Sequence, residues 1–262
     1  MTLLQTILAV ASGGAVGFTL GLVGGGGSIL AVPLLVYVVG VPNAHVAIGT
    51  SAVAVAASAA ANLFGHARAR TVKWPCALIF ALAGIAGAAF GAQLGKMVDG
   101  TRLLAAFGAL MIVIGALLLR PRKSDGDADV ALTRASMPRL LPWLIGIGLL
   151  VGLLSGFFGI GGGFLIVPGL MGATAMPLIN AIGSSLVSVA AFGATTAASY
   201  AWSGLVDWPL AIFFIVGGAF GGLVGTRLAQ HLAGRSKHIL AMAFSTIVIV
   251  VGLYVVARSL LQ

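Results

Sequence analysis

Residues 21–33 read GLVGGGGSILAVP and residues 156–168 read GFFGIGGGFLIVP, so one glycine-rich motif occurs twice, 135 residues apart. Each glycine inside a helix costs about 1 kcal/mol relative to alanine, and a cluster of four therefore predicts a break in the helix. Both motifs lie within long apolar stretches. The chain is thus expected to contain two interrupted apolar helices at corresponding places.

Further matches outside the motif indicate that the whole chain is a tandem duplication. After a one-residue deletion the offset becomes 134, where residues 47–51 (AIGTS) correspond to residues 181–185 (AIGSS) and Trp74-Pro75 corresponds to Trp208-Pro209. A stretch rich in Arg and Asp joins the two copies. We therefore predict a first transmembrane repeat at 1–119, a polar cytoplasmic linker at 120–138 and a second transmembrane repeat at 139–262.

The composition excludes a soluble fold. Of the 262 residues, 60% are hydrophobic and 7% are charged, and the mean hydropathy is +1.15, whereas a soluble domain is about a quarter charged. The apolar stretches are about 17 to 25 residues long, which suits helices that cross a bilayer, and they lack the alternation of a transmembrane barrel. The predicted fold class is an all-α polytopic membrane protein.

Each repeat is expected to hold one glycine-broken re-entrant hairpin and three transmembrane helices. The broken segments lie at about 5–40 and 140–174, and the plain helices lie near 45–65, 75–96, 102–119, 178–202, 208–229 and 238–258. Glycines also recur every four residues at 87, 91 and 95 and at 217, 221 and 225. Such rows favour close packing of helix backbones.

The basic residues indicate the orientation. The net charge of +9 comes from Lys and Arg at segment ends and in connections, which argues for topology signals and contacts to lipid rather than for nucleic acid. If each broken segment is a re-entrant hairpin that returns to the side it started from, one side of the membrane has 11 Lys and Arg residues and the other has 3. If the broken segments cross the membrane fully, the split is 9 and 5. The positive-inside rule therefore favours inverted repeats, with the linker cytoplasmic and both termini outside.

The paired breaks also predict where a substrate binds. Backbone groups freed at membrane depth must line a protein-enclosed cavity, and matching interrupted helices mark the binding site of many transporters. The short apolar pieces from Ser28 to about Gly40 and from Phe164 to about Gly172 would present helix N-termini, which attract anions. Hydroxyls and amides lie around them at Ser28, Thr50, Ser51, Ser58, Asn62, Ser155, Asn180, Ser184, Ser185, Ser188, Thr195 and Thr196. The predicted substrate-binding residues are Gly25, Gly26, Gly27, Ser28, Thr50, Ser51, Asn62, Gly161, Gly162, Gly163, Phe164, Ser184, Ser185 and Thr196.

These motifs resemble those of the sulfite exporter TauE/SafE family, also called the TSUP permeases. The resemblance is carried by the glycines at 17, 21 and 24–27 with Val32-Pro33, by residues 49–51, and by their counterparts at 152–163, 167–168 and 183–185. It implies a permease of the bacterial inner membrane that moves a small anion such as sulfite, sulfoacetate or a related carboxylate or sulfonate. It does not fix the cargo.

Other classes are less well supported. A metal-cation permease needs intramembrane ligands, but His45, His66, His231 and His238 lie near predicted helix ends. An enzyme needs a nucleophile beside a base, and no buried base accompanies the serines, so no catalytic residue, metal or cofactor is expected. The chain has no Glu, and its five Asp lie at helix ends or in the linker, which disfavours a carboxylate proton relay. An anion channel, a permease for a different small solute and self-association into a homo-oligomer are left open.

Overall fold

The computed structural model describes residues 3–23, 25–119, 136–161, 163–231 and 237–260, and in these ranges the regular structure is entirely helical. The predicted linker falls outside them except for residues 136–138, as do Gly24 and Gly162 of the two motifs. The elements are α1 (Leu3–Val23), η1 (Gly25–Leu30), α2 (Ala31–Pro33), η2 (Leu34–Val38), α3 (Ala44–Arg68), α4 (Trp74–Met97), α5 (Gly100–Leu118), α6 (Met137–Phe158), α7 (Gly163–Thr174), α8 (Leu178–Trp202), α9 (Trp208–His231) and α10 (Lys237–Leu260).

Seven of the described helices are long and apolar enough to cross a membrane, namely α1, α3, α4, α5, α6, α8 and α9. The prediction of an all-α polytopic membrane protein is therefore confirmed. Local chemistry fixes several helix starts. The Asn43 side chain accepts a hydrogen bond from the His45 N–H (2.9 Å) at the start of α3, and Asp99 accepts one from the Thr101 N–H (3.0 Å) at the start of α5. Such caps satisfy backbone donors that have no partner within the helix.

The chain is interrupted at both glycine motifs. After the first, the single short helix expected from Ser28 onward is instead a 3₁₀ turn (η1), a brief α turn (α2) and a π turn (η2). The π turn begins directly after Pro33, which has no N–H to continue the α-helical hydrogen-bond ladder. At the second motif α6 ends at Phe158 and is capped by Gly159, which has a left-handed backbone (φ +68°), and Gly161 has a similar one (φ +65°).

The closest helix contacts join the first half of the chain to the second. The α1 helix packs on α9 and α4 packs on α6, while α3 packs on α8 and α5 on α10. A side chain at Gly17 would collide with the Gly218 carbonyl, and one at Gly152 with the Gly84 carbonyl. The rows at 87, 91, 95 and at 217, 221, 225 lie in these same two contacts. Their predicted role in close backbone approach is confirmed.

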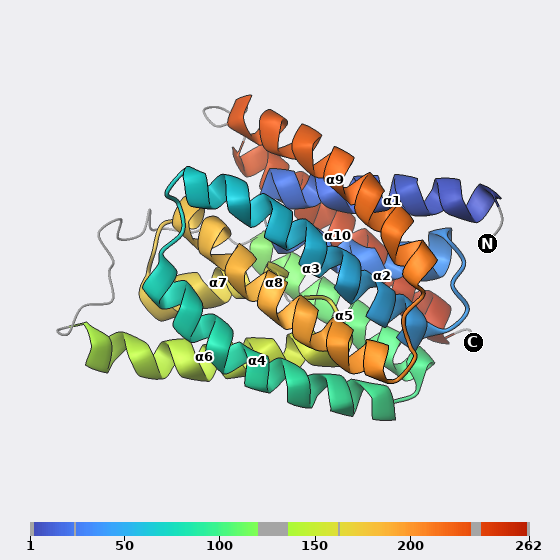
Figure 1. Cartoon of the computed structure of the whole chain (residues 1–262), viewed down its shortest axis with the longest axis horizontal. Coiled ribbons are helices and arrows are strands. Elements are labelled where there is room, and N and C mark those ends of the chain that lie inside the picture. Colours follow the sequence, from blue (N-terminus) through green and yellow to red (C-terminus); the bar gives the residue numbers. More distant parts are fainter. Residues whose placement is uncertain (1–2, 24, 120–135, 162, 232–236, 261–262) are drawn as a thin grey trace.

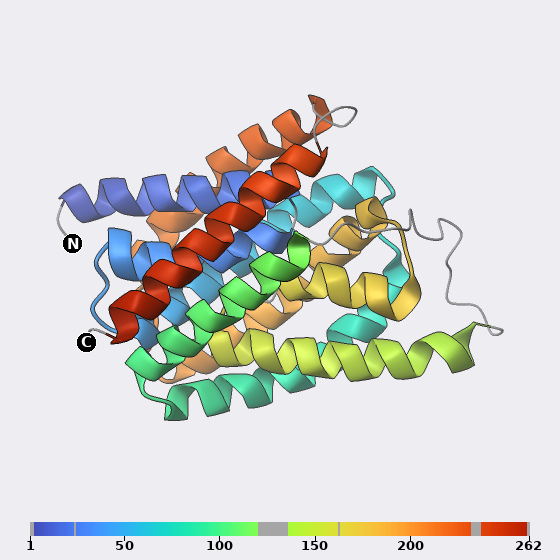
Figure 2. The ribbon, with the colours of Figure 1, turned by 180° about the vertical axis from the view of Figure 1, so that it is seen from behind.

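The order of the contacts gives the helix directions. Gly13, Gly17 and Gly21 meet Phe214, Gly218 and Gly222 in turn, so α1 and α9 run parallel. By the same reasoning α4 and α6 run parallel, whereas α3 and α8, and also α5 and α10, run antiparallel. The start of α1 and the end of α10 lie at one end of the bundle, here called the terminus end (Figures 1 and 2). The first residues of α6 lie at the opposite end (Figure 1).

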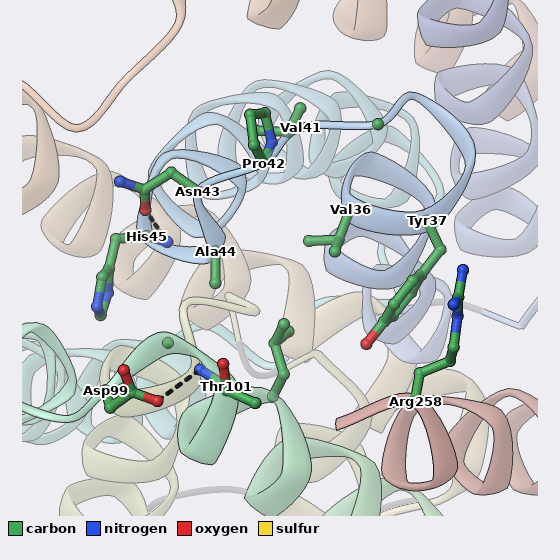
Figure 3. A pocket seen from close by; sticks show the side chains of 13 residues that line it. Val36, Tyr37, Val41, Pro42, Asn43, Ala44, His45, Asp99, Thr101 and Arg258 are labelled. Carbon is green, nitrogen blue, oxygen red and sulfur yellow. Dashed lines mark hydrogen bonds between the residues drawn. The ribbon is translucent and has the colours of Figure 1, made fainter. Parts of the chain in front are cut away.

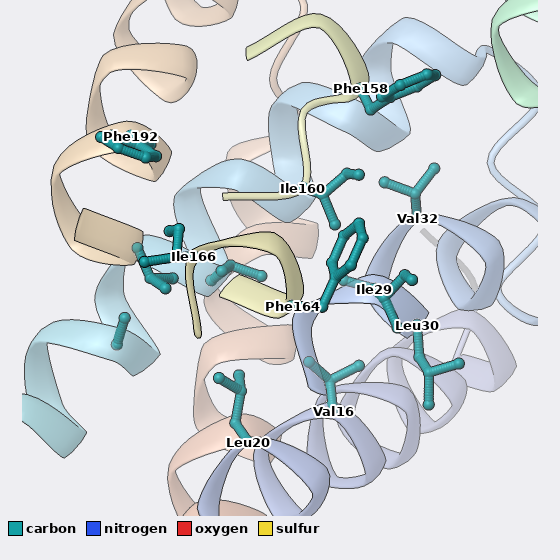
Figure 4. Close-up of a cluster of buried hydrophobic side chains, with 14 of the residues drawn as sticks. Val16, Leu20, Ile29, Leu30, Val32, Phe158, Ile160, Phe164, Ile166 and Phe192 are labelled. Carbon is teal, nitrogen blue, oxygen red and sulfur yellow. The ribbon is translucent and has the colours of Figure 1, made fainter. Parts of the chain in front are cut away.

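The two interrupted segments meet inside the bundle, where η1 contacts α7. Apolar side chains fill this contact: Ile29, Ile160 and Phe164 are each no more than 2% exposed, and Figure 4 shows them beside one another. The centre of the molecule is thus closed by hydrophobic packing in this conformation.

Candidate functional site

Two of the predicted site residues bind backbone amides of a distant segment. The Thr50 hydroxyl of α3 accepts a hydrogen bond from the N–H of Asp207 (3.0 Å), the residue before α9. The Ser184 hydroxyl of α8 accepts one from the N–H of Lys73 (2.9 Å), the residue before α4. Both hydroxyls are fully buried. Each therefore ties a membrane helix to the start of a helix from the other half of the chain.

These two hydroxyls lie at opposite ends of the bundle. Gly49, next to Thr50, packs against Tyr200 and Leu205 at the C-terminal end of α8, whereas Ser184 lies near the beginning of α8. The 16 residues between Ser184 and Tyr200 span roughly 25 Å of helix at 1.5 Å per residue. The structure therefore does not bring Thr50 and Ser184 together around one small anion.

Three more predicted side chains donate to their own helix. Ser51 donates to the Ile48 carbonyl (2.9 Å), Ser185 to the Ile182 carbonyl (2.8 Å) and the Asn62 amide to the Ser58 carbonyl (3.0 Å). Such local bonds are common for polar residues inside helices. In this conformation their donors are occupied.

The glycine breaks themselves lie in the interior. Gly27, Ser28, Gly163 and Phe164 are buried, and a side chain at Gly27 would overlap the backbone of Thr19 and Leu20. A Cβ at Gly161 would lie 2.9 Å from a Val55 methyl group and 3.4 Å from a Val189 methyl group. The second break is therefore enclosed between α3 and α8.

Some buried hydroxyls have no hydrogen-bond partner among the described residues. These include Thr196, which belongs to the predicted set, and Ser155 and Ser188; all three are 0% exposed, and the Ser199 and Tyr200 hydroxyls also have no partner in the described structure. Leaving a buried polar group unpaired costs about 1–3 kcal/mol. Ser155 lies in the last turn of α6 before the break, and Ser188 precedes Val189, which contacts Gly161. Ser155 and Ser188 are therefore available as donors near the second break.

A cavity of about 530 Å³ lies at the terminus end. Its polar lining residues are Tyr37, Asn43, His45, Asp99, Thr101 and Arg258. Figure 3 shows His45 and Asp99 on one side of the cavity and Tyr37 and Arg258 on the other. A second cavity of about 240 Å³ shares residues 40–43 with it and includes Gln5 and Asp207. Three chain segments that are distant in sequence, residues 36–45, residues 99–104 and Arg258, form the first cavity, so no local motif could reveal it.

The cavity contains groups that suit an anion. The Arg258 Nε donates to the Tyr254 hydroxyl (3.3 Å), and the described residues give Arg258 no carboxylate partner. The His45 Nδ1 is buried and has no partner in the described part of the chain. Asp99 is negative, but its carboxylate already accepts hydrogen bonds from the Thr101 and Arg102 N–H groups. A guanidinium with free donors can bind an oxyanion in a bidentate manner.

The comparison with known families decides what kind of protein this is. The model of the family described as "Sulfite exporter TauE/SafE" matches residues 9–255. The chain belongs to this family. Proteins with similar sequences carry the names of membrane transporters, and this chain is accordingly a multi-pass membrane transporter.

Two of the similar proteins come from Xylella fastidiosa and one comes from Bacillus subtilis. A "Probable membrane transporter protein" of strain 9a5c is 54% identical over 259 residues, which cover 99% of this chain and 98% of the relative. Its counterpart in strain Temecula1 is 53% identical over the same shares. The Bacillus subtilis "Probable membrane transporter protein YunE" is 28% identical, over 91% of this chain and 92% of its own. No solved structure matches this chain significantly.

The hydrogen bonds of Thr50 and Ser184 give a testable prediction for the stability of this TauE/SafE protein. We expect Thr50→Val and Ser184→Ala each to reduce the free energy of unfolding by about 1 kcal/mol, because each leaves a helix-start N–H without its acceptor. Thermal unfolding of the detergent-purified protein measures the change. Ser51→Ala is the control, since Ser51 makes only a local bond. An equal loss in Ser51→Ala would show that the long-range bonds contribute nothing specific.

Proposed function

We propose that this transporter carries a small anion, such as sulfite, sulfoacetate or a related carboxylate or sulfonate, across the bacterial inner membrane. The observation that carries the proposal is the pair of glycine-interrupted segments, which end inside the bundle and contact each other through η1 and α7. Interrupted helices of this kind place unpaired backbone N–H groups at membrane depth. Such groups stabilise negative charge without requiring a buried cation.

The second break provides the better-defined half of the proposed site. The α7 helix has 12 residues and begins at the buried Gly163, so its first N–H groups point into the protein. Thr196, Ser155 and Ser188 add hydroxyl donors that the described structure leaves unpaired. We assign substrate binding to the glycine breaks and these hydroxyls, and we assign Thr50 and Ser184 to helix positioning.

Several contacts support two inverted units that exchange access between the two sides. Corresponding helices α3 and α8 run antiparallel, and so do α5 and α10. The contacts between the halves come in matching pairs, α1 with α9 and α6 with α4. The cavity at the terminus end provides an opening on one side of the bundle, while apolar side chains close the contact between the breaks. Rocking of one unit against the other would move the apolar side chains that close the contact between the breaks.

Counterflow in proteoliposomes tests the proposal. Vesicles loaded with unlabelled sulfite, sulfoacetate, acetate or sulfate should accelerate uptake of the same labelled anion when the protein is present, and the rate should saturate with concentration. Vesicles loaded with choline chloride provide the control for leakage. Uptake that is linear in concentration, together with single-molecule currents, would favour the anion channel; no acceleration by any anion of the panel would refute the proposed cargo class.

A further inference from the structure

We propose that the path of the anion runs along one buried face of α8, from the cavity at the terminus end to the second glycine break, and that Phe192 closes it. This inference extends the proposed function by assigning the route and its gate. It depends on four groups that are buried and have no hydrogen-bond partner in the described structure: His45 Nδ1, the Tyr200 hydroxyl, Thr196 Oγ1 and Ser188 Oγ.

Helix geometry places three of these groups on one side of α8. At about 100° and 1.5 Å per residue, Ser188, Thr196 and Tyr200 fall within roughly 120° of one another and extend over roughly 18 Å of α8. All three residues are 0% exposed. Together they form a polar stripe through a helix whose other buried residues are mostly apolar.

The neighbours of α8 show where the stripe faces. Phe192 packs against Phe80 of α4, with ring centroids 6.4 Å apart, and Val189 contacts Gly161 of the second break. The directions of Ser188 and Thr196 lie close to those of Phe192 and Val189 on the helix, within about 100° of one another. The stripe therefore faces the region between α4 and the second break, inside the bundle.

The stripe differs from the ordinary hydroxyls of the same helix. Ser185 donates to the Ile182 carbonyl (2.8 Å) and Thr195 donates to the Ala191 carbonyl (2.8 Å). Such local bonds are the usual way in which a hydroxyl is satisfied within a membrane helix. Ser188 and Thr196 do not make them and are instead available to a passing ligand.

The outer end of the stripe lies next to His45, which lines the cavity. The Tyr200 ring lies 6.4 Å from the ring of His45. Lys96 lies nearby, with its Nζ 5.8 Å from the centre of the Tyr200 ring, and donates to the Ser199 carbonyl (3.2 Å) and the Ser203 hydroxyl (3.0 Å). A cation beside Tyr200 and hydroxyl donors further along the stripe suit a small oxyanion rather than a cation.

Phe192 interrupts the stripe between Ser188 and Thr196. It is 0% exposed, and a side chain at Gly84 would overlap its ring, so the ring fills the space beside α4 completely. The position 134 residues earlier is Ser58, whose hydroxyl lies 3.0 Å from where a Cβ at Gly218 would be. The aromatic ring is therefore specific to the second half of the chain. A hydrophobic constriction of this kind can block ions by excluding water.

Cysteine labelling tests the path without requiring the cargo to be known. Cys76 is the single cysteine and is buried, so Cys76→Ala provides the background. Thr196→Cys and Ser188→Cys are compared with Ala194→Cys, which lies at similar depth on the exposed side of α8. A small, anionic, membrane-impermeant thiosulfonate is added from the terminus end. We expect Thr196→Cys to react at least about tenfold faster than Ala194→Cys, because a thiolate forms only where water reaches.

The gate is tested in the same background. Phe192→Ala should raise the labelling rate of Ser188→Cys by about tenfold or more and change that of Thr196→Cys much less, because Ser188 lies beyond the ring. If the Phe192→Ala variant does not fold, the Phe192→Val variant is used instead. Equal labelling of Thr196→Cys and Ala194→Cys would refute the path, and an unchanged rate at Ser188→Cys would refute the gate. Since labelling needs no transported substrate, these results are independent of the counterflow panel.

Discussion

Gly152→Val is expected to prevent recovery of monodisperse protein. A Cβ at this position would lie 2.6 Å from the Cα of Gly84 and would also collide with the Gly84 carbonyl oxygen. Backbone atoms cannot rotate away as a side chain does, so α4 and α6 must separate and lose the packing along their whole contact. Overpacking of a tight core that forces backbone shifts costs about 1–3 kcal/mol, and occasionally more. Size-exclusion chromatography after detergent extraction gives the measurement.

The same helix offers a matched control. Gly146 of α6 is exposed, and a Cβ there would meet no atom within 4 Å. Gly146→Val should therefore yield normal amounts of monodisperse protein with an unchanged melting temperature. If Gly152→Val behaves like Gly146→Val, α4 and α6 do not approach as closely as described.

Gly161→Ala is expected to reduce anion flux by about tenfold or more, equivalent to a barrier increase of at least about 1.4 kcal/mol. Gly161 has a left-handed backbone (φ +65°), which costs an alanine about 1–2 kcal/mol. The new methyl group would also press on Val55, at 2.9 Å from its side chain. Both effects would shift the backbone at the break, where the proposed donors lie. Initial rates of counterflow, corrected for the amount of reconstituted protein, measure the effect.

Gly172→Ala is the matched control for this substitution. Gly172 lies in the same interrupted segment, within α7, has no left-handed backbone, and a Cβ there would meet nothing within 4 Å. Its flux should stay within about twofold of the wild type, because an alanine fits an ordinary helical position at least as well as glycine. Normal flux in Gly161→Ala would exclude the second break from the transport site.

The sequence predicted the helices well because each boundary has a local cause. The predicted helix at 178–202 coincides with α8 (Leu178–Trp202), and the one near 75–96 is within a residue of α4 (Trp74–Met97). Apolar length, Pro in the first turn and the glycine clusters act over a few residues. The π turn after Pro33 was not predicted, because it depends on how the backbone hydrogen bonds readjust inside the packed protein.

The arrangement of the candidate site was harder to predict, because it depends on which helices pair and in which direction. The repeat places Thr50 and Ser184 at corresponding positions, which suggested a shared site. Antiparallel packing of α3 on α8 separates them instead and pairs each with the start of a distant helix. Likewise, the sequence shows many hydroxyls but cannot distinguish Ser185, which bonds locally, from Ser188, which does not.

The cross-packing of α1 on α9 and of α4 on α6 has a consequence for biosynthesis. When residues 1–119 have left the ribosome, the glycine faces of α1 and α4 have no partner yet, because both partners lie in the half still to be made. These two glycine faces therefore stay exposed to lipid until the second half has been inserted. Neither half of the gene alone should give a folded product, whereas the two halves expressed together should assemble.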